Sequence, residues 1–351
     1  MTVRLLVLGG TAFVGRAVAE EAQRRGWAVT TFSRGHSGKP PAGVEGLYGD
    51  RTDPDDLRQL AGRRFDLVVD TWRDDPAAVQ ASTALLADTV DRYLYVSSLS
   101  VYRWPAEPGF DEDAPRVTYR PPTGDDPFDA YAMAKTGGEQ AVREAFGDRA
   151  LLARTGVILG PYEYVGRLPW WLLRIARGGT VLAPGPASAS LQYIDCRDLA
   201  DWLLTAGLRG LHGPYNVLSE PGHTTMAGLL DACRTVTGST AELVWVPEDF
   251  LLDQGVRAWS ELPIWLPATD RLAATYQVGV SRVAGTGLRC RDVHDTVADT
   301  WRWLGSLDEA GLAREAGQHK PWFTAEREAA VLAAWRQANL GTATADLTAV
   351  D

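Results

Sequence analysis

Cysteine is scarce in this chain, and the positions of the few cysteines exclude two kinds of structural cross-link. The 351 residues include three cysteines, Cys196, Cys233 and Cys290. They are odd in number and far apart, and they lack CxxC or His-paired spacing. Neither a disulfide framework nor a zinc site is therefore predicted. We expect no metal site, and a reducing cytoplasm is the compartment that fits this pattern best.

An excess of basic charge and long apolar runs are also missing. The 35 Lys and Arg residues are outnumbered by 45 Asp and Glu residues, for a net charge of -10. Such a balance disfavours a protein whose main task is neutralising nucleic-acid phosphates, although a local basic pocket stays open. No segment approaches the roughly 20 apolar residues of a spanning helix. We expect a soluble cytoplasmic protein that binds neither nucleic acid nor membrane.

Apolar runs and helical patterns alternate along the first half of the chain, whose overall composition is ordinary for a globular protein. Apolar residues make up 45% and charged residues 23%. Strands are predicted at residues 3–8, 27–32, 65–70, 93–97 and 151–159, and a further one before Asp50. Helices are predicted at 17–25, 53–61, 76–91 and 129–146. This alternation predicts an α/β fold with a doubly wound parallel sheet of the Rossmann type.

The amino-acid composition changes after Gly160, where Gly, Pro and Trp become frequent. This change predicts a smaller substrate-binding lobe that is discontinuous in sequence, formed by residues 161–189 and 219–292. The dinucleotide-binding domain is predicted to comprise residues 1–160, with 190–218 and 293–305 returning to it. Residues 306–338 predict a C-terminal helical extension, and the small, polar residues 341–351 predict a disordered tail.

A glycine-rich turn stands between the first predicted strand and the helix that follows it, in LGGTAFVGRAV. Glycines there allow a tight turn, the approach of a pyrophosphate to backbone N–H groups, and close packing of helix on sheet. With a strand before it and a helix after it, the turn predicts a dinucleotide site, the alternative being a plain tight turn. We expect the cofactor to contact Gly9, Thr11, Ala12, Phe13, Val14 and Gly15.

The end of the second strand indicates which dinucleotide binds. It carries Ser33 and Arg34 and no acidic residue. An acid would accept from a ribose 2′-OH, whereas Arg suits a 2′-phosphate, so NADP(H) is favoured over NAD(H). Asp50 can accept from the adenine amino group or cap a turn, and both interpretations stay open. Arg51, Thr71 and Val157 complete the cofactor-binding residues that we predict.

Three residues form the predicted catalytic group. Tyr131 and Lys135, in YAMAK, are four apart in a predicted helix and share one face. A nearby ammonium stabilises phenolate and moves the tyrosine pKa from about 10 toward the working range, and the lysine can also hold the cofactor ribose. Ser98, in YVSSLSVY, ends a predicted strand at the sheet edge where a cofactor would lie. Its hydroxyl can polarise a substrate oxygen.

These motifs resemble those of the extended or atypical short-chain dehydrogenases/reductases, the NAD(P)-dependent epimerase/dehydratase-like group. The landmarks are GGTAFVG, SSLSVY, YAMAK and IDCRDLA, and the resemblance covers about residues 1 to 305. Ser98 stands four residues before Tyr102, as the family's catalytic Ser or Thr does. The resemblance therefore implies a catalytic trio of Ser98, Tyr131 and Lys135.

Departures from the family pattern narrow the expected chemistry. Leu99 and Ser100 replace the Asp-Glu pair of the sugar 4,6-dehydratases, so dehydratase chemistry is not expected. Thr155 or Gly156, and Leu191, stand where the family's Asn and Arg grip the diphosphate of sugar nucleotides. The helix at 76–91 contains no Asn, so the proton relay lacks its usual fourth member, for which a water can substitute.

The sequence as a whole predicts an NADP(H)-dependent reductase or dehydrogenase acting on a carbonyl or secondary alcohol of a small molecule, with Tyr131 as proton donor or acceptor. The alternatives are an NAD-dependent sugar or sugar-nucleotide epimerase and a non-catalytic nucleic-acid-binding or sensing protein of the atypical group. Tryptophans in the lobe suit an apolar or aromatic substrate as well as a core: Trp170, Trp171, Trp245, Trp259 and Trp265. The substrate, the reaction direction and a homodimeric state are left open.

Overall fold

The computed structural model describes residues 2–121, 126–312 and 322–348, with side chains up to residue 340. The chain divides into two compact units. Unit 1 comprises Met1–Tyr162, Gln192–Pro221 and Ala274–Arg291, and unit 2 comprises Glu163–Leu191, Gly222–Ala273 and Asp292–Asp351. Both units are discontinuous in sequence. Within the described residues, no helix combines the length and the apolarity needed to cross a membrane.

A parallel seven-stranded sheet forms the centre of unit 1, in the order β11-β6-β5-β4-β1-β2-β3. The strand order reverses between β1 and β4, which is the switch point where folds of this type bind their ligands. The predicted doubly wound sheet is confirmed. Its strands are β1 (Arg4–Leu8), β2 (Ala28–Ser33), β3 (Glu45–Tyr48), β4 (Phe65–Asp70), β5 (Val90–Ser98), β6 (Ala150–Thr155) and β11 (Gly213–Asn216).

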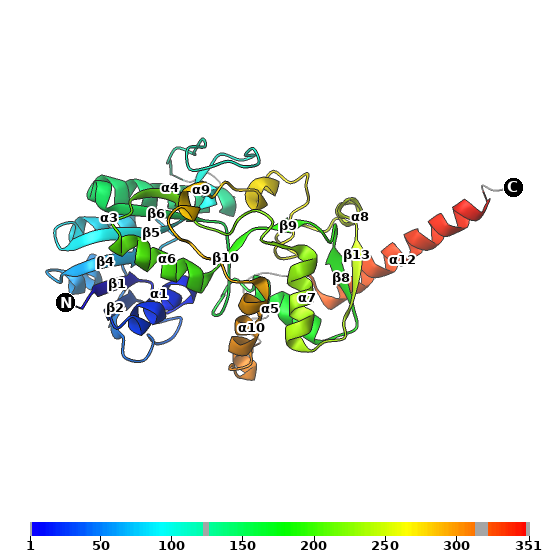
Figure 1. Cartoon of the computed structure of the whole chain (residues 1–351), viewed down its shortest axis with the longest axis horizontal. Helices are drawn as coiled ribbons and strands as arrows, with labels where there is room; N and C mark the ends of the chain where they lie inside the picture. The colour runs from blue at the N-terminus through cyan, green and yellow to red at the C-terminus, as the bar shows by residue number, and fades with distance from the viewer. Residues whose placement is uncertain (1, 122–125, 313–321, 349–351) are drawn as a thin grey trace. The chain divides into compact units, whose positions relative to one another are not determined.

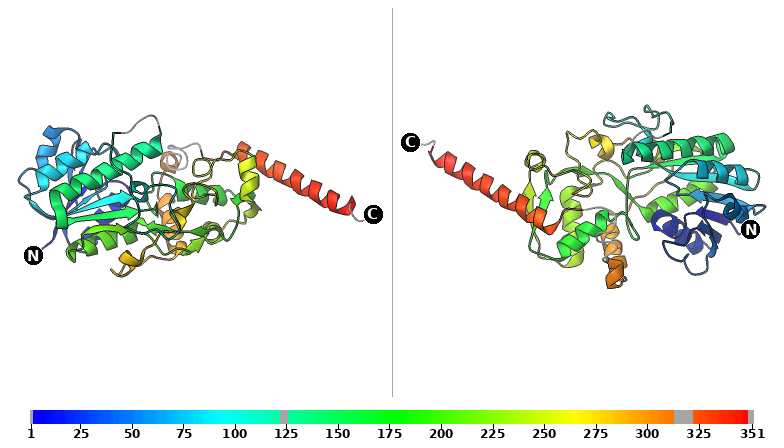
Figure 2. Two further views of the ribbon diagram at one scale, coloured as in Figure 1. Left: turned by 90° about the horizontal axis from the view of Figure 1, so that it is seen from above. Right: turned by 180° about the vertical axis from the view of Figure 1, so that it is seen from behind.

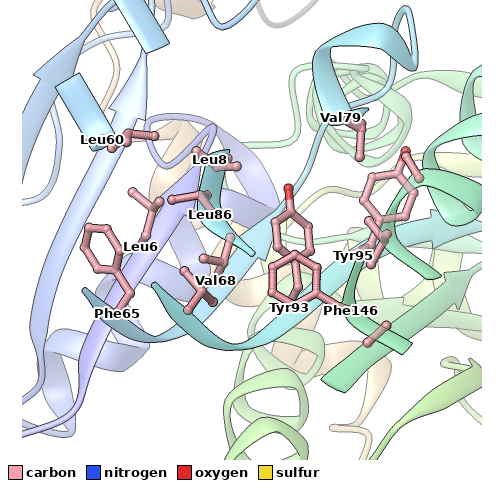
Figure 3. Packing of buried hydrophobic residues seen from close by; sticks show 14 of the residues in the cluster. Leu6, Leu8, Leu60, Phe65, Val68, Val79, Leu86, Tyr93, Tyr95 and Phe146 are labelled. Atoms are coloured by element: carbon pink, nitrogen blue, oxygen red, sulfur yellow. The ribbon is translucent and has the colours of Figure 1, made fainter. Parts of the chain in front are cut away.

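Helices cover both faces of this sheet, as Figure 1 shows. α1 (Phe13–Arg24) packs beside α6 (Cys196–Leu208) on one face, and α3 (Ala77–Leu86) beside α4 (Pro127–Phe146) on the other. The α3 and α4 side holds a core cluster that includes Leu6, Val68, Tyr93, Tyr95 and Phe146, drawn in Figure 3. Coverage on both faces explains why these strands are continuous apolar runs in the sequence. Unit 1 also contains α2 (Pro54–Leu57), α9 (Ser281–Ala284) and the short 3-10 helix η2 (Leu99–Val101).

The single strand predicted at 151–159 is two strands in the structure. β6 ends at Thr155, and after Gly156 the chain continues as β7 (Val157–Leu159), which pairs with β10 (Tyr193–Asp195). β10 was expected to return to the main sheet and instead forms this separate two-stranded sheet. The apolar run reads as one strand because both halves are buried, although they have different partners.

Unit 2 is built from short strands and helices. α7 (Met226–Thr237) packs against α5 (Arg167–Ala176) and α10 (Val293–Leu304), and β13 (Glu242–Val246) pairs in parallel with β8 (Thr180–Pro184). The remaining elements are β9 (Ser190–Leu191), β12 (Thr224–Thr225) and α8 (Glu248–Asp253). Residues 293–305 were expected in the dinucleotide-binding domain. They lie in unit 2 because α10 packs on the helices of that unit.

The last described helix, α12 (Ala325–Thr348), corrects the expectation of a disordered tail for residues 341–348, while 349–351 lie outside the described residues. Figure 2 shows it as one continuous red helix. Its first turns are fixed to unit 2 through Glu328, which accepts from Arg174 Nε at 2.6 Å and from the Leu182 amide at 3.0 Å. The segment 341–348 contains no proline, and its glycine and threonines favour a helix less than alanine does without excluding one.

In unit 1, a buried ion pair holds the carboxyl end of β4. Arg51 donates to both carboxylate oxygens of Asp70, at 2.6 and 2.9 Å, and to Ser82 Oγ at 2.7 Å. The Tyr93 hydroxyl donates to the same carboxylate at 2.6 Å. Burial alone would raise the pKa of Asp70, but the Arg51 charge and these hydrogen bonds outweigh it and hold the pKa below its ordinary value.

Replacing Asp70→Leu should lower the free energy of unfolding by about 3–5 kcal/mol, because it leaves the buried Arg51 charge without its partner. The contribution of the pair is complete above the ordinary Asp pKa of 3.8 and is lost as the pH falls through the lower folded-state pKa. Urea titrations at neutral and acidic pH measure both effects. The double variant Arg51→Met/Asp70→Leu should regain most of the loss, and equal instability of the single and double variants would contradict this explanation.

Candidate active site

The glycine turn lies at the switch point of the sheet, between β1 and α1. Gly9 has a φ of +100°, a conformation that L side chains rarely adopt. A Cβ atom on Gly15 would lie 2.1 Å from the Gly9 carbonyl oxygen, so the first turn of α1 packs directly on the backbone of the turn. The N-terminal end of α1 lies at this turn, and a helix N-terminus is the end that attracts anions. This backbone cradle fits a dinucleotide pyrophosphate.

The first residue of α1 is under backbone strain. Phe13 has a φ of +38°, which is an outlier for an aromatic residue. Thr11, Phe13 and Val14 are buried, and Ala12 precedes the helix with extended backbone and no side-chain cap. Strained residues concentrate at ligand sites, where the surrounding structure holds them in place. The predicted contact residues 11–15 thus form one continuous turn around the helix end.

The end of β2 presents a polar surface next to this turn. The Ser33 hydroxyl is buried and has no hydrogen-bond partner within the described chain. Arg34 is exposed, and Asp50 is close enough for the charges of Arg34 and His36 to lower its pKa, after the larger effect of hydrogen bonds from Thr52. Asp50 Oδ1 accepts from the Thr52 amide and hydroxyl at 2.9 and 2.7 Å, so it caps a turn. An orphaned hydroxyl beside an exposed guanidinium fits a nucleotide ribose and its substituent.

Three other predicted cofactor residues have different environments. Thr71 follows β4 and donates to the Leu8 carbonyl at 3.0 Å, and its hydroxyl lies 2.4 Å from where a Cβ on Gly9 would stand. Val157 is buried in β7. The side chain of Arg51 is buried in its ion pair with Asp70, although its Nε has no hydrogen-bond partner among the described residues.

Ser98 lies at the carboxyl end of β5 and is the half-exposed member of three neighbouring serines. Its Oγ accepts from the Ser100 amide at 3.2 Å and thereby caps η2. The Ser97 hydroxyl is buried and donates to Glu139 Oε1 at 2.7 Å, so it is already used within the protein. Of the three serines, Ser98 is therefore the one whose side chain is partly exposed.

Tyr131 and Lys135 lie one turn apart on α4, as the spacing predicts. α4 begins after Asp126, whose side chain accepts from the Phe128 amide at 2.9 Å, with Pro127 at the first helical position. Tyr131 is 37% exposed, whereas Lys135 is 3% exposed, and Lys135 Nζ lies 5.9 Å from the Tyr131 ring centroid. One face of the helix therefore carries an accessible phenol above a buried ammonium.

Two backbone carbonyls hold the Lys135 ammonium. Nζ donates to the Val96 carbonyl at 2.8 Å and to the Trp72 carbonyl. Val96 is two residues before Ser98, and Trp72 follows the end of β4, so this one side chain ties α4 to both strand ends. Burial lowers the pKa of Lys135 to about 7, because the surrounding protein solvates the charge less well than water.

Sequence reasoning missed one polar group in this region, the Ser100 hydroxyl. Ser100 lies in η2, directly after the serine assigned to catalysis, and η2 packs against α4. Its Oγ is buried and has no hydrogen-bond partner among the described residues. No sequence pattern distinguishes such an orphaned hydroxyl from an ordinary core serine, because its partners are set by the fold.

Lys135→Met should remove a pH dependence from the stability of the cofactor-free protein. Between pH 7 and 10.5 the lysine of the unfolded chain holds a proton that the buried lysine has lost, so its contribution to stability rises with pH across this window. Urea midpoints of the wild type and the variant, measured across this window, should diverge as the pH falls. Lys39→Met, which changes an exposed lysine, is the matched control. Parallel curves for the wild type and Lys135→Met would contradict the lowered pKa.

Comparisons with known proteins agree with this geometry. The sequence matches the model of the NAD dependent epimerase/dehydratase family over residues 5–217. It is 29% identical over 310 residues to the 2′-dehydrokanamycin reductase of Streptomyces kanamyceticus, covering 82% of this chain and 84% of that protein. It is 25% identical over 276 residues to the UDP-glucose 4-epimerase of Corynebacterium glutamicum, covering 67% of this chain and 81% of that enzyme.

Solved structures show the same fold. The enzyme WbmH of Bordetella bronchiseptica, solved in complex with NAD+, superposes with a TM-score of 0.66 over 88% of this chain and 100% of that chain, at 18% sequence identity. The family resemblance inferred from the sequence motifs is confirmed by the family match, which spans more than half of the chain. The chain therefore belongs to the NAD-dependent epimerase/dehydratase family and is an NAD(P)-dependent oxidoreductase or epimerase.

Proposed function

We propose that this chain is an NADP(H)-dependent reductase or dehydrogenase that acts on a carbonyl or secondary alcohol of a small molecule. The observation that carries the proposal is the buried Lys135 Nζ, which donates to the Val96 carbonyl, two residues before Ser98 in β5, and lies 5.9 Å from the Tyr131 ring centroid. The similarity to a 2′-dehydrokanamycin reductase supports a net reduction.

In this proposal Ser98 and Tyr131 both act on the substrate oxygen, and Lys135 supports Tyr131 or the cofactor. The bound nicotinamide supplies or accepts the hydride. The Ser98 hydroxyl donates to the substrate oxygen, since its own lone pair already accepts from the Ser100 amide. Tyr131 gives its proton to that oxygen in reduction and takes it back in oxidation. Lys135 has three N–H donors, of which two are used by carbonyls, and the third serves the Tyr131 hydroxyl or the cofactor ribose.

The preference for NADP(H) rests on the end of β2. Ser33 offers an unused hydroxyl, and Arg34 offers an exposed guanidinium that matches a 2′-phosphate with two parallel hydrogen bonds. No carboxylate ends β2 to receive the 2′-OH of NAD(H).

The substrate is proposed to be a small molecule, and the tryptophans of unit 2 bear on whether part of it is apolar or aromatic. Trp170, Trp171 and Trp265 are buried in unit 2, and Trp171 Nε1 donates to the Pro263 carbonyl at 2.9 Å, so these three act as core residues. Trp245 and Trp259 are partly exposed and keep an apolar or aromatic substrate portion open.

An epimerase is the second candidate, favoured by the similarity to a UDP-glucose 4-epimerase and by the same trio of residues. Against it, Leu191 is a buried apolar residue of β9, where sugar-nucleotide enzymes of this type carry an arginine. The two candidates differ in cofactor use. A reductase consumes NADPH stoichiometrically, and an epimerase is purified with tightly bound NAD and consumes none. Mass spectrometry of the co-purified nucleotide separates them.

Tyr131→Phe should reduce turnover by about 10²- to 10⁴-fold, because it removes the proton donor. The dissociation constant for NADPH should stay unchanged, since the glycine turn is untouched. The assay follows NADPH oxidation with 2′-dehydrokanamycin and a panel of aryl and sugar ketones. Tyr119→Phe is the matched control, since Tyr119 is 38% exposed, close to the exposure of Tyr131. Full activity of Tyr131→Phe on any ketone that the wild type reduces would disprove the role.

Arg34→Gln should weaken NADPH binding by about 10- to 100-fold and leave NADH binding unchanged, because the lost hydrogen bonds to an ionised 2′-phosphate are worth about 1.5–3 kcal/mol. Fluorescence titration with each nucleotide measures the two constants. Arg58→Gln, an exposed arginine that pairs with Asp55, is the control. Equal weakening of both nucleotides would assign Arg34 a role unrelated to the 2′-phosphate.

A further inference from the structure

Helix α4 carries a buried carboxylate that the proposed reaction does not use. Glu139 lies one turn after Lys135 and therefore shares its face of the helix. Glu139 is 2% exposed, and a carboxylate removed from water in this way is costly unless it is paired. Arg154 of β6 supplies the pairing, since its Nε and Nη2 atoms each donate to one carboxylate oxygen at 2.8 Å.

α4 packs directly on β5 at this level. A Cβ atom on Gly138 would lie 2.3 Å from the Tyr95 hydroxyl oxygen, so any larger residue there would displace the helix or the tyrosine. The close approach lets two successive turns of α4 bind the end of β5. Lys135 donates to a backbone carbonyl of β5 at 2.8 Å, and Glu139, one turn later, accepts from the Ser97 hydroxyl at 2.7 Å.

The ion pair also reaches the far end of the segment that follows β5. Arg154 Nη1 donates to the Tyr102 hydroxyl at 3.0 Å, and Tyr102 ends η2. That hydroxyl in turn donates to Asn216 Oδ1 at 2.6 Å. Ser97, Arg154 and Asn216 stand opposite one another on the neighbouring strands β5, β6 and β11. The segment between Ser97 and Tyr102 is therefore held at both ends by groups that the sheet and α4 fix in place.

The members of this network are closed off from water. Ser97, Tyr102 and Arg154 are each 1% exposed, and Asn216 is fully buried. A hydrogen bond broken in so dry an environment is not replaced by a bond to water, so leaving it unmade is costly. Ser98 follows Ser97 directly and lies between the two held ends. It is the partly exposed residue that the proposed reaction places on the substrate oxygen.

We propose that Glu139 is a positioning residue for Ser98. Through its bonds to Ser97 and Arg154 it fixes the strand end relative to α4, the helix that also carries Tyr131. The inference rests on the proposed function, in which Ser98 and Tyr131 act on the same substrate oxygen. Such joint action needs a defined geometry, because a misplacement of about 1 Å can lower a rate by about 10²-fold. Glu139 itself takes no part in the proton transfer.

Ser97→Ala removes one hydrogen bond while Arg154 still pairs with both Glu139 oxygens, so the variant should fold, and its urea midpoint checks this. With a ketone that the wild type reduces, kcat should fall by about 10- to 100-fold. In a Ser98→Ala background the same substitution should cause no further loss, since no hydroxyl remains to be positioned. A merely structural role would lower kcat by the same factor in both backgrounds. Thr83→Val is the matched control, because that hydroxyl is also buried but donates at 3.0 Å to a carbonyl within its own helix.

Amide hydrogen exchange measures the positioning without a substrate. The Ser100 amide donates to Ser98 Oγ at 3.2 Å, so its exchange reports whether that side chain stays in place. In nuclear magnetic resonance spectra, Ser97→Ala should speed this exchange by at least about tenfold, and Tyr102→Phe, which releases the other end of the segment, should act in the same direction. Ser98→Ala lacks the acceptor and sets the upper limit, while Thr83→Val should exchange as the wild type does.

The outcomes separate this inference from the proposed function. A wild-type rate in Ser98→Ala would overturn the proposed function, and the positioning role would fall with it. An equal loss of kcat from Ser97→Ala in both backgrounds, unchanged Ser100 exchange in that variant, or equally fast exchange in Thr83→Val would each overturn the positioning role and leave the proposed function standing.

Discussion

The burial of the Lys135 ammonium is the constraint on which the active site depends. A charged group in so dry an environment is costly unless its donors are satisfied, and here two carbonyl oxygens satisfy two of them. Those carbonyls belong to Val96 in β5 and Trp72 after β4, while the lysine itself belongs to α4. Lys135 thus holds α4, β5 and the residue that follows the end of β4 close together. Tyr131 lies one turn before Lys135 on α4, and its ring centroid is 5.9 Å from Lys135 Nζ.

Close packing at the glycine turn supplies the other half of the site. The space between β1 and α1 is too small for a Cβ at Gly15, so the helix end sits directly on the turn and aims its amides at the switch point of the sheet. The ion pair of Arg51 with Asp70 fixes the end of β4, from which Thr71 and Trp72 follow. The glycine turn proposed to hold the cofactor and the buried Lys135 are therefore supported by one set of neighbouring strand ends.

Membership of the family does not decide which reaction this chain catalyses. The trio can serve net reduction, oxidation or epimerisation, because each needs only proton transfer at one oxygen and a hydride at the adjacent carbon. Two features of this chain bear on what the site is proposed to bind: the polar end of β2, with its orphaned Ser33 hydroxyl, and the buried Leu191 of β9. Neither feature changes the proposed proton chemistry.

The sequence by itself determined the parallel sheet and the shared helix face of Tyr131 and Lys135, because both follow from local periodicity: apolar runs for buried strands, and a spacing of four for one helix face. Only the tertiary structure decided which strands pair and which helices pack together. The run at 151–159 is broken at Gly156 since β7 takes β10 as its partner, and residues 293–305 join unit 2 since α10 packs on α5 and α7. Likewise, the partners of Arg51 and the lack of a partner for the buried Ser100 hydroxyl among the described residues follow from how segments far apart in the chain pack. Local pattern reports which face of an element is buried, and it carries no information on which distant element covers that face.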